Sequence, residues 1–142
     1  MRISDVLRRK GDEVVTVPPD ESVRTLLTKL AEHKVGAMVV SADGSTVDGI
    51  VSERDVVRHL NSDGEVMLSE TVAQIMTSDV HTCTPQATVV DVMRTMTDQR
   101  VRHIPVVVDG RLAGIVSIGD VVKHRIDELT DERDHLTAYI SR

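Results

Sequence analysis

The chain contains an internal duplication, and this feature constrains its fold more than any other. Residues 49–57 read Gly-Ile-Val-Ser-Glu-Arg-Asp-Val-Val and residues 114–122 read Gly-Ile-Val-Ser-Ile-Gly-Asp-Val-Val, so seven of nine positions are identical at an offset of 65. Four earlier positions match at an offset of 66, namely Thr16, Pro19, Val23 and Val35 with Thr82, Pro85, Val89 and Val101. Matches that keep both order and spacing indicate two copies of one structural unit.

Each copy predicts the same first strand and first helix. Short strands are expected at residues 14–17 and 81–84, because proline follows each run and ends it. Ser22 and Thr88 have side chains that cap helices. Apolar residues then recur at i, i+3, i+4 and i+7, which predicts a helix with one buried face. The two stripes are Val23, Leu26, Leu27 and Leu30, and Val89, Val92, Met93 and Met96.

Each copy continues with a predicted hairpin and a second helix. The apolar runs lie at 37–40 and 47–51 in the first copy and at 104–108 and 112–116 in the second. An Asp-Gly pair separates the runs of each copy, which is typical of strands joined by a turn. Helices are expected to begin at Glu53 and Ile118, so the order is β-α-β-β-α twice, an α+β fold with α/β-like elements. Because the runs are continuously apolar, both strand faces need cover, and we expect the copies to share one core.

Composition and charge exclude several functions. The net charge is −6, whereas a nucleic-acid binder needs a basic face, so no nucleic-acid partner is expected. Residues 1–10 lack the apolar core of a signal peptide, and no apolar run approaches the ~20 residues that span a bilayer. A cytoplasmic protein without membrane contact is therefore expected. Cys83 is the only cysteine and the six histidines lack the spacing of metal ligands, so no metal site is expected.

The duplicated Gly-Ile-Val-Ser-x-x-Asp motif, in this order of elements, resembles the CBS-domain family over residues 1–126. Residues 3–7 and 72–77 resemble the short lead-in helix that precedes each CBS strand. The resemblance implies tandem CBS domains packed as a pseudo-two-fold pair, with repeat 1 at 1–66, repeat 2 at 67–126 and a helical tail at 127–142. In many family members the clefts between the repeats hold AMP, ADP, ATP, NAD or S-adenosylmethionine.

Two Ser-x-x-Asp segments, Ser52 to Asp55 and Ser117 to Asp120, are the main candidates for ligand binding. From the pattern alone each is a capping box at a helix start. The same place suits an anion, because a helix start presents unpaired N–H groups. By resemblance, Asp55 and Asp120 would hold a ribose, and the two serines would contact ribose or phosphate. Both interpretations stay open at this point.

By resemblance, Arg102 and His103 would meet the phosphate of the same ligand. Arginine is always charged and grips two phosphate oxygens at once. The first copy has Gly36 and Ala37 at the matching positions, so the two sites are expected to be unequal. We expect tighter binding at Asp120, and Arg54 is the candidate phosphate contact at Asp55. A solvated strand start remains the alternative for Arg102 and His103.

The adenine of such a ligand would need an apolar slot. Thr16, Thr82 and Thr84 lie on the first strands, which line the clefts of the family, as do Val17 and Cys83. Met38 and Ile104 are the candidates that would sandwich the base. For all these positions, ordinary core packing is an equally good interpretation.

The tail has an apolar seam with steps of four and three residues, typical of a coiled coil. Its members are Val122, Ile126, Leu129, Arg133, Leu136 and Ile140, with Arg133 as the interruption. The seam could join two chains, dock an effector protein or pack on its own domain. In each case we expect Tyr139 and Ile140 to be anchored.

The sequence therefore predicts a regulatory module that is not an enzyme, since no nucleophile, metal set or acid–base pair stands out. Its expected ligand is an adenosine nucleotide (AMP, ADP, ATP or NAD(H)) in the cleft between the repeats. The signal would pass through a homodimer or an effector protein whose identity is unknown. The alternative is a structural adaptor dimer that needs no ligand.

Overall fold

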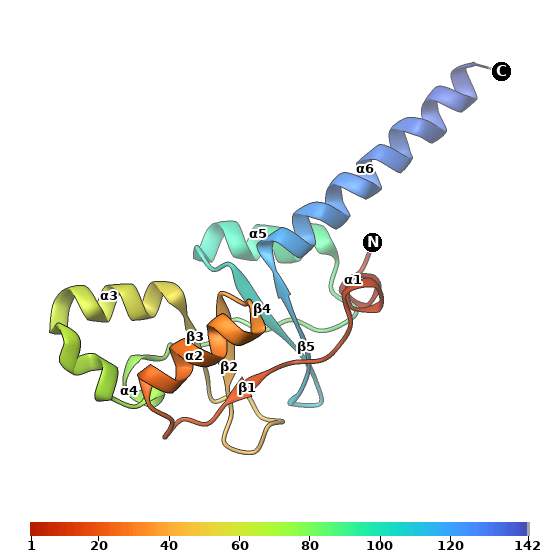
Figure 1. The fold of residues 1–142 in the computed structure, drawn as a ribbon. Coiled ribbons are helices and arrows are strands. Elements are labelled where there is room, and N and C mark those ends of the chain that lie inside the picture. Colours follow the sequence, from red (N-terminus) through yellow and green to blue (C-terminus); the bar gives the residue numbers. More distant parts are fainter. Residues whose placement is uncertain (142) are drawn as a thin grey trace. The chain divides into compact units, whose positions relative to one another are not determined.

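The computed structural model describes residues 1–141 and has the mixed helix and strand content that the sequence predicts (Figure 1). The helices are α1 (Ile3–Lys10), α2 (Val23–His33), α3 (Glu53–Asp63), α4 (Val72–Ile75), α5 (Val89–Gln99) and α6 (Ile118–Ile140), with a 3₁₀ turn, η1, at Glu65–Ser69. The strands are β1 (Thr16–Val17), β2 (Ala37–Val40), β3 (Gly49–Ser52), β4 (His103–Val108) and β5 (Arg111–Ser117). Each copy thus has a lead-in helix, a helix, a hairpin and a closing helix.

The chain divides into two compact units, each with a core of its own. Unit 1 contains Met1–Asp12, Thr82–Val107 and the chain from Gly114 onward, and unit 2 contains Glu13–His81 and Val108–Ala113. The buried apolar side chains form two separate clusters, one in each unit. Ala37 and Val39, on the other face of β2, are also buried but belong to neither cluster. The expectation of one core shared by the two copies stays a prediction.

Unit 2 is built on a three-stranded sheet in the order β1-β2-β3. β1 pairs with β2 in parallel, and β2 pairs with β3 as an antiparallel hairpin in which Met38 lies opposite Val51. The hydroxyl of Ser22 accepts a hydrogen bond from the Thr25 N–H at 3.1 Å and so begins α2, as expected for a capping residue. Leu26 of α2 is fully buried in the core with Met38 and Val51.

Unit 1 contains most of the two-stranded sheet β4-β5, whose turn and adjoining strand ends, Val108–Ala113, belong to unit 2. The turn of this hairpin has Asp109 and Gly110 at φ values of 51° and 75°, and two consecutive positive φ angles are what a tight hairpin turn needs. The segment at 81–84 does not form the regular strand that the sequence predicts. Only Cys83 bridges β4, through its N–H to the Pro105 oxygen at 3.0 Å and its oxygen to the Val107 N–H at 2.8 Å. Pro85 has no N–H to extend this pairing.

Each lead-in helix packs in the core of the other sequence repeat. Ile3 and Val6 of α1 are fully buried among residues of the second repeat, including Val89. Val72 and Ile75 of α4 are buried in the same way among residues of the first repeat. The backbone follows the same exchange, because the Ile3 N–H donates to Ala87 and the Val72 N–H to Glu21. The division of the chain in space therefore differs from the division into repeats by sequence.

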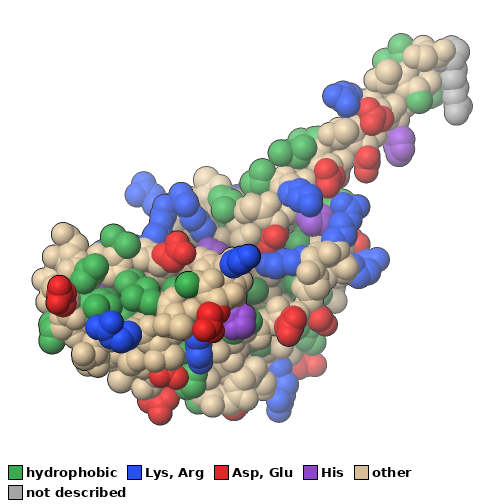
Figure 2. All heavy atoms as spheres, in the orientation of Figure 1, with side chains coloured by type: hydrophobic (Ala, Val, Ile, Leu, Met, Phe, Trp, Pro, Cys, Tyr) green, Lys and Arg blue, Asp and Glu red, His purple; other side chains and the backbone are tan. Residues whose placement is uncertain are grey.

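The last helix leaves its apolar seam exposed. α6 is one continuous helix of 23 residues, and Figure 1 shows it running past α1 and α5. Ile126 is 57% exposed and Leu136 is 64% exposed. Figure 2 shows such apolar side chains between the charged groups along α6. Tyr139 and Ile140 are 75% and 79% exposed, so their expected anchoring is not provided by the chain's own domain and stays a prediction for a second chain or an effector protein.

Gly49 and Gly114 occupy equivalent positions in the two repeats and test whether each lead-in segment packs against the other repeat. A Cβ atom at Gly49 would lie 2.5 Å from Met76 Sδ and 2.9 Å from the backbone oxygen of Thr77. The three atoms nearest to one at Gly114 all belong to the Leu7 side chain, with Cδ2 at 2.7 Å. A side-chain end can move but a paired backbone oxygen cannot. We expect Gly49→Ala to lower the free energy of unfolding by about 1–3 kcal/mol and Gly114→Ala by less. Urea unfolding measures both; equal losses, or the small gain of an unhindered Gly→Ala change, would contradict these contacts.

Candidate functional site

Two helix starts in the structure have the same construction. The Ser52 N–H donates to Asp55 Oδ2 at 2.8 Å, and the Ser117 N–H donates to Asp120 Oδ2 at 2.8 Å. In return, the serine hydroxyl oxygens accept from the N–H groups of Asp55 and Asp120 at 3.4 and 3.2 Å. Both segments are therefore capping boxes, as the pattern predicts. Within residues 1–141 these bonds use Oδ2 of each aspartate, which leaves Oδ1 available to a ligand.

Each helix start is also tied to the strand region that precedes the hairpin. The first helical N–H of α3, at Glu53, donates to the Gly36 oxygen at 3.0 Å. That of α6, at Ile118, donates to the Arg102 oxygen at 2.8 Å. Positions 36 and 102 match in the duplication, so both repeats fix the helix start in the same way. In unit 1 this bond holds the Arg102 backbone beside the start of α6.

A cation distinguishes the two helix starts. Lys10, at the end of α1, places its Nζ 2.6 Å from Asp120 Oδ2 and 2.9 Å from the Ile115 oxygen. Burial alone would raise the pKa of Asp120, but the hydrogen bonds from Lys10 and Ser117 outweigh it, and the pKa is lowered. Among the described basic side chains, none pairs with Asp55. The sequence does not predict this role for Lys10, since only the exchange of lead-in helices brings residues 110 positions apart together.

The predicted site residues are divided between the two units. Unit 1 contains Thr82, Thr84, Arg102, His103, Ile104, Ser117 and Asp120, and unit 2 contains Thr16, Met38, Ser52, Arg54 and Asp55. Arg102 is exposed, and its side chain pairs with no acid in the part of the chain that the structure describes. His103 is half-buried as the first residue of β4. The predicted phosphate contacts therefore lie in the same unit as Asp120.

The two residues expected to sandwich the adenine are core residues. Met38 and Ile104 are each 1% exposed and belong to the cores of unit 2 and unit 1. The core interpretation that the sequence left open is therefore confirmed for both. Their contact with a base stays a prediction.

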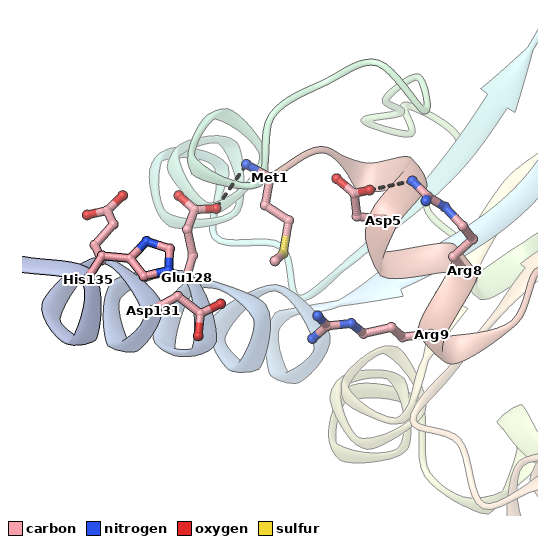
Figure 3. A pocket seen from close by; sticks show the side chains of 8 residues that line it. Met1, Asp5, Arg8, Arg9, Glu128, Asp131 and His135 are labelled. Carbon is pink, nitrogen blue, oxygen red and sulfur yellow. Dashed lines mark hydrogen bonds and ion pairs between the residues drawn. The ribbon is translucent and has the colours of Figure 1, made fainter. Parts of the chain in front are cut away.

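Unit 1 also contains a groove of about 680 Å³ that does not include Asp120. Figure 3 shows it between α1 and α6, with an ion pair between the Met1 amino group and Glu128 and another between Arg8 and Asp5. The lining residues are Met1, Asp5, Arg8, Arg9, Glu128, Asp131, Glu132 and His135. Carboxylates outnumber the cations there, so the groove does not suit the phosphate of a nucleotide.

The described chain lacks the features of two other kinds of site. In residues 1–141, no group of three or more His, Cys, Asp or Glu side chains is arranged to hold a metal ion. Over the same residues, no helix is both long and apolar enough to cross a membrane.

The fold and the paired helix starts define a tandem CBS pair, and the family comparison agrees. The family model described as CBS domain matches residues 3–62 and 72–127, so the chain belongs to the CBS-domain family. The mitochondrial CBS domain-containing protein CBSX3 of Arabidopsis thaliana is 38% identical over 97% of this chain and 71% of that protein. The CBS-domain protein ATU1752 from Agrobacterium tumefaciens has a crystal structure with a TM-score of 0.85 and 47% identity, covering 88% of this chain and 99% of that one.

A more distant structure shares the fold. The CBS domain pair of MJ0100, solved in complex with 5′-methylthioadenosine and S-adenosyl-L-methionine, has a TM-score of 0.79 at 22% identity. It covers 90% of this chain and 98% of that chain. The resemblance that the duplicated motif carries is thus confirmed.

Cys83 lies between the candidate residues Thr82 and Thr84 and reports on the packing of this segment. Burial raises the pKa of its thiol to about 11, well above the ordinary value of a cysteine. Because the thiolate is the reactive form, we expect iodoacetamide to label the folded protein at pH 8 about 100-fold more slowly than the protein in urea. The rate should rise with pH until the thiol titrates. Equal rates in folded and unfolded protein would show that Cys83 is not packed as described.

Proposed function

We propose that this chain is a regulatory CBS pair that binds an adenosine nucleotide at the start of α6 and has no catalytic activity. The single observation that carries the proposal is the Asp120 carboxylate, whose side chain is 24% exposed and keeps one oxygen free of hydrogen bonds to residues 1–141. A carboxylate suits a ribose because it accepts hydrogen bonds from both hydroxyls of the diol. In the cytoplasm, the expected location, such nucleotides report on metabolic state.

The phosphate of the ligand is assigned to Arg102 and His103 of the same unit. The exposed Arg102 side chain is free to form charge-assisted bonds, which are the strong ones. Since the whole chain carries a net charge of −6, a nucleotide needs local cations to bind at all. The adenosine-containing ligands in the MJ0100 structure support this ligand class at the level of the fold.

The second helix start, at Asp55, is proposed as the weaker site. It has the same capping box, and its candidate phosphate contact is the exposed Arg54 on α3. Gly36 stands where unit 1 has Arg102, so one cation is missing there. Asp55 and Asp120 therefore form a matched pair in which the capping geometry is constant and the charge around it differs.

Isothermal titration calorimetry with AMP, ATP and NADH tests the ligand class and the inequality together. We expect heat from at least one of the three and about a tenfold loss of affinity in Asp120→Ala, because a carboxylate–diol contact is removed. Asp55→Ala removes the same kind of cap and is the matched control, with a smaller expected loss. No heat from any nucleotide with folded protein would refute the ligand, and equal losses would refute the inequality.

A second candidate function, a ligand-independent adaptor dimer, is favoured by the exposed seam of α6. Ile126, Leu129, Leu136 and Ile140 are 57%, 45%, 64% and 79% exposed and recur at coiled-coil spacing. Such an apolar stripe on one helix is a surface that a second copy or an effector protein would cover. We propose a homodimer as the state in solution, with α6 as part of its interface.

Analytical ultracentrifugation with and without AMP tests the role of α6. We expect a dimer whose dissociation constant increases about tenfold or more in Leu136→Glu, because the change places a charge in the apolar seam. Ala138→Glu, on the outward side of the same helix, is the control and should leave the dimer intact. A monomer in all conditions, or equal effects of the two changes, would contradict the interface. A dimer indifferent to AMP favours the adaptor over the sensor.

A further inference from the structure

We infer that Lys10 makes the Asp120 site select phosphorylated nucleotides against unphosphorylated nucleosides. The inference rests on the proposed function and adds a residue that the duplicated motif does not contain. The Lys10 ammonium holds Oδ2 of Asp120 and leaves only Oδ1 free, whereas a ribose diol bound through both hydroxyls needs both carboxylate oxygens. A ligand therefore has to displace Lys10, and only a ligand with a phosphate offers the displaced ammonium a new anionic partner.

The geometry places Lys10 in direct competition with a ribose. Its Nζ lies 2.6 Å from Asp120 Oδ2, the same oxygen that accepts the Ser117 N–H at 2.8 Å. A second bond, 2.9 Å to the Ile115 oxygen, orients the ammonium across the start of α6. The two side chains are 34% and 24% exposed, so a ligand reaches the pair from solvent and the pair opens without disturbing the core.

Unit 2 shows that the capping geometry does not need this lysine. Ile50 is the counterpart of Ile115, and its oxygen accepts a backbone bond from the Thr77 N–H at 2.9 Å. Asp55 forms its capping box with Ser52 alone, among residues 1–141. Lys10 is therefore an addition to one helix start, and its removal leaves a construction that unit 2 already has.

The displacement of Lys10 from Asp120 favours a nucleotide over a nucleoside. A nucleoside replaces a charged donor on Asp120 with two neutral hydroxyls and leaves the ammonium with the Ile115 oxygen but no anionic partner, so the exchange is unfavourable. With a nucleotide, the ammonium leaves one anion and gains another, and its long flexible stem allows that movement. The preference for a nucleotide over a nucleoside then depends on the new partner of Lys10 and not on the ribose contact, which both ligands make.

Calorimetry with AMP and adenosine on four proteins tests the inference: wild type, Lys10→Gln, Lys10→Arg and Arg9→Gln. We expect Lys10→Gln to weaken AMP binding and strengthen adenosine binding, so that the ratio of their affinities falls about tenfold. Lys10→Arg keeps the charge and should keep most of the ratio. Arg9→Gln removes the same charge one residue away, where Arg9 pairs with Asp127 at 3.3 Å, and should leave the ratio unchanged.

The outcomes separate this inference from the function on which it rests. A wild-type protein that binds AMP, with an affinity ratio unchanged in Lys10→Gln, overturns the role of Lys10 and leaves the nucleotide site intact. A ratio that falls equally in Arg9→Gln reduces Lys10 to general surface charge and also overturns it. A wild-type protein that binds neither adenosine nor any of AMP, ATP and NADH overturns the proposed function itself.

Discussion

The packing of α1 against the second repeat is the interaction on which the rest of unit 1 depends. Ile3 and Val6 are fully buried beside Val89, and the Ile3 N–H is bonded to the Ala87 oxygen at 2.9 Å. Burying two such side chains contributes about 3–6 kcal/mol before the entropy of ordering the helix is counted. Once α1 is fixed there, its last residue, Lys10, reaches the start of α6. The fold of the core thus decides the charge at the candidate site.

The capping boxes join local structure to the proposed binding function. Each aspartate caps the start of a helix with one oxygen, so the residue stabilises that helix whether or not a ligand binds. The same position leaves the second oxygen without a hydrogen bond to residues 1–141, as the proposed binding function requires. The structural and the functional interpretations of Ser-x-x-Asp are therefore compatible, and the local geometry alone does not separate them. The charges around each box, Lys10 and Arg102 at one and Arg54 at the other, are what distinguish the two.

The sequence predicts the features that depend on short-range patterns or on the duplicated motif. The helix stripes at Leu26 and Met96, the capping boxes and the hairpins follow from short-range patterns, and the duplicated motif carries the family. The single shared core stays a prediction, because apolar strands show that they are covered but not by which elements. The Lys10–Asp120 pair was not predictable, since it joins residues from different repeats and has no counterpart at Asp55. The exposed end of α6 is a similar case, because a coiled-coil pattern does not state whether its partner is in the same chain.

A crystal structure of the protein grown with AMP tests the central claim most directly. The account predicts a ribose whose hydroxyls donate to Asp120, a phosphate near Arg102, and a Lys10 ammonium that has left the carboxylate for the phosphate. An AMP molecule bound elsewhere, with the Lys10–Asp120 pair intact beside an empty helix start, would contradict it.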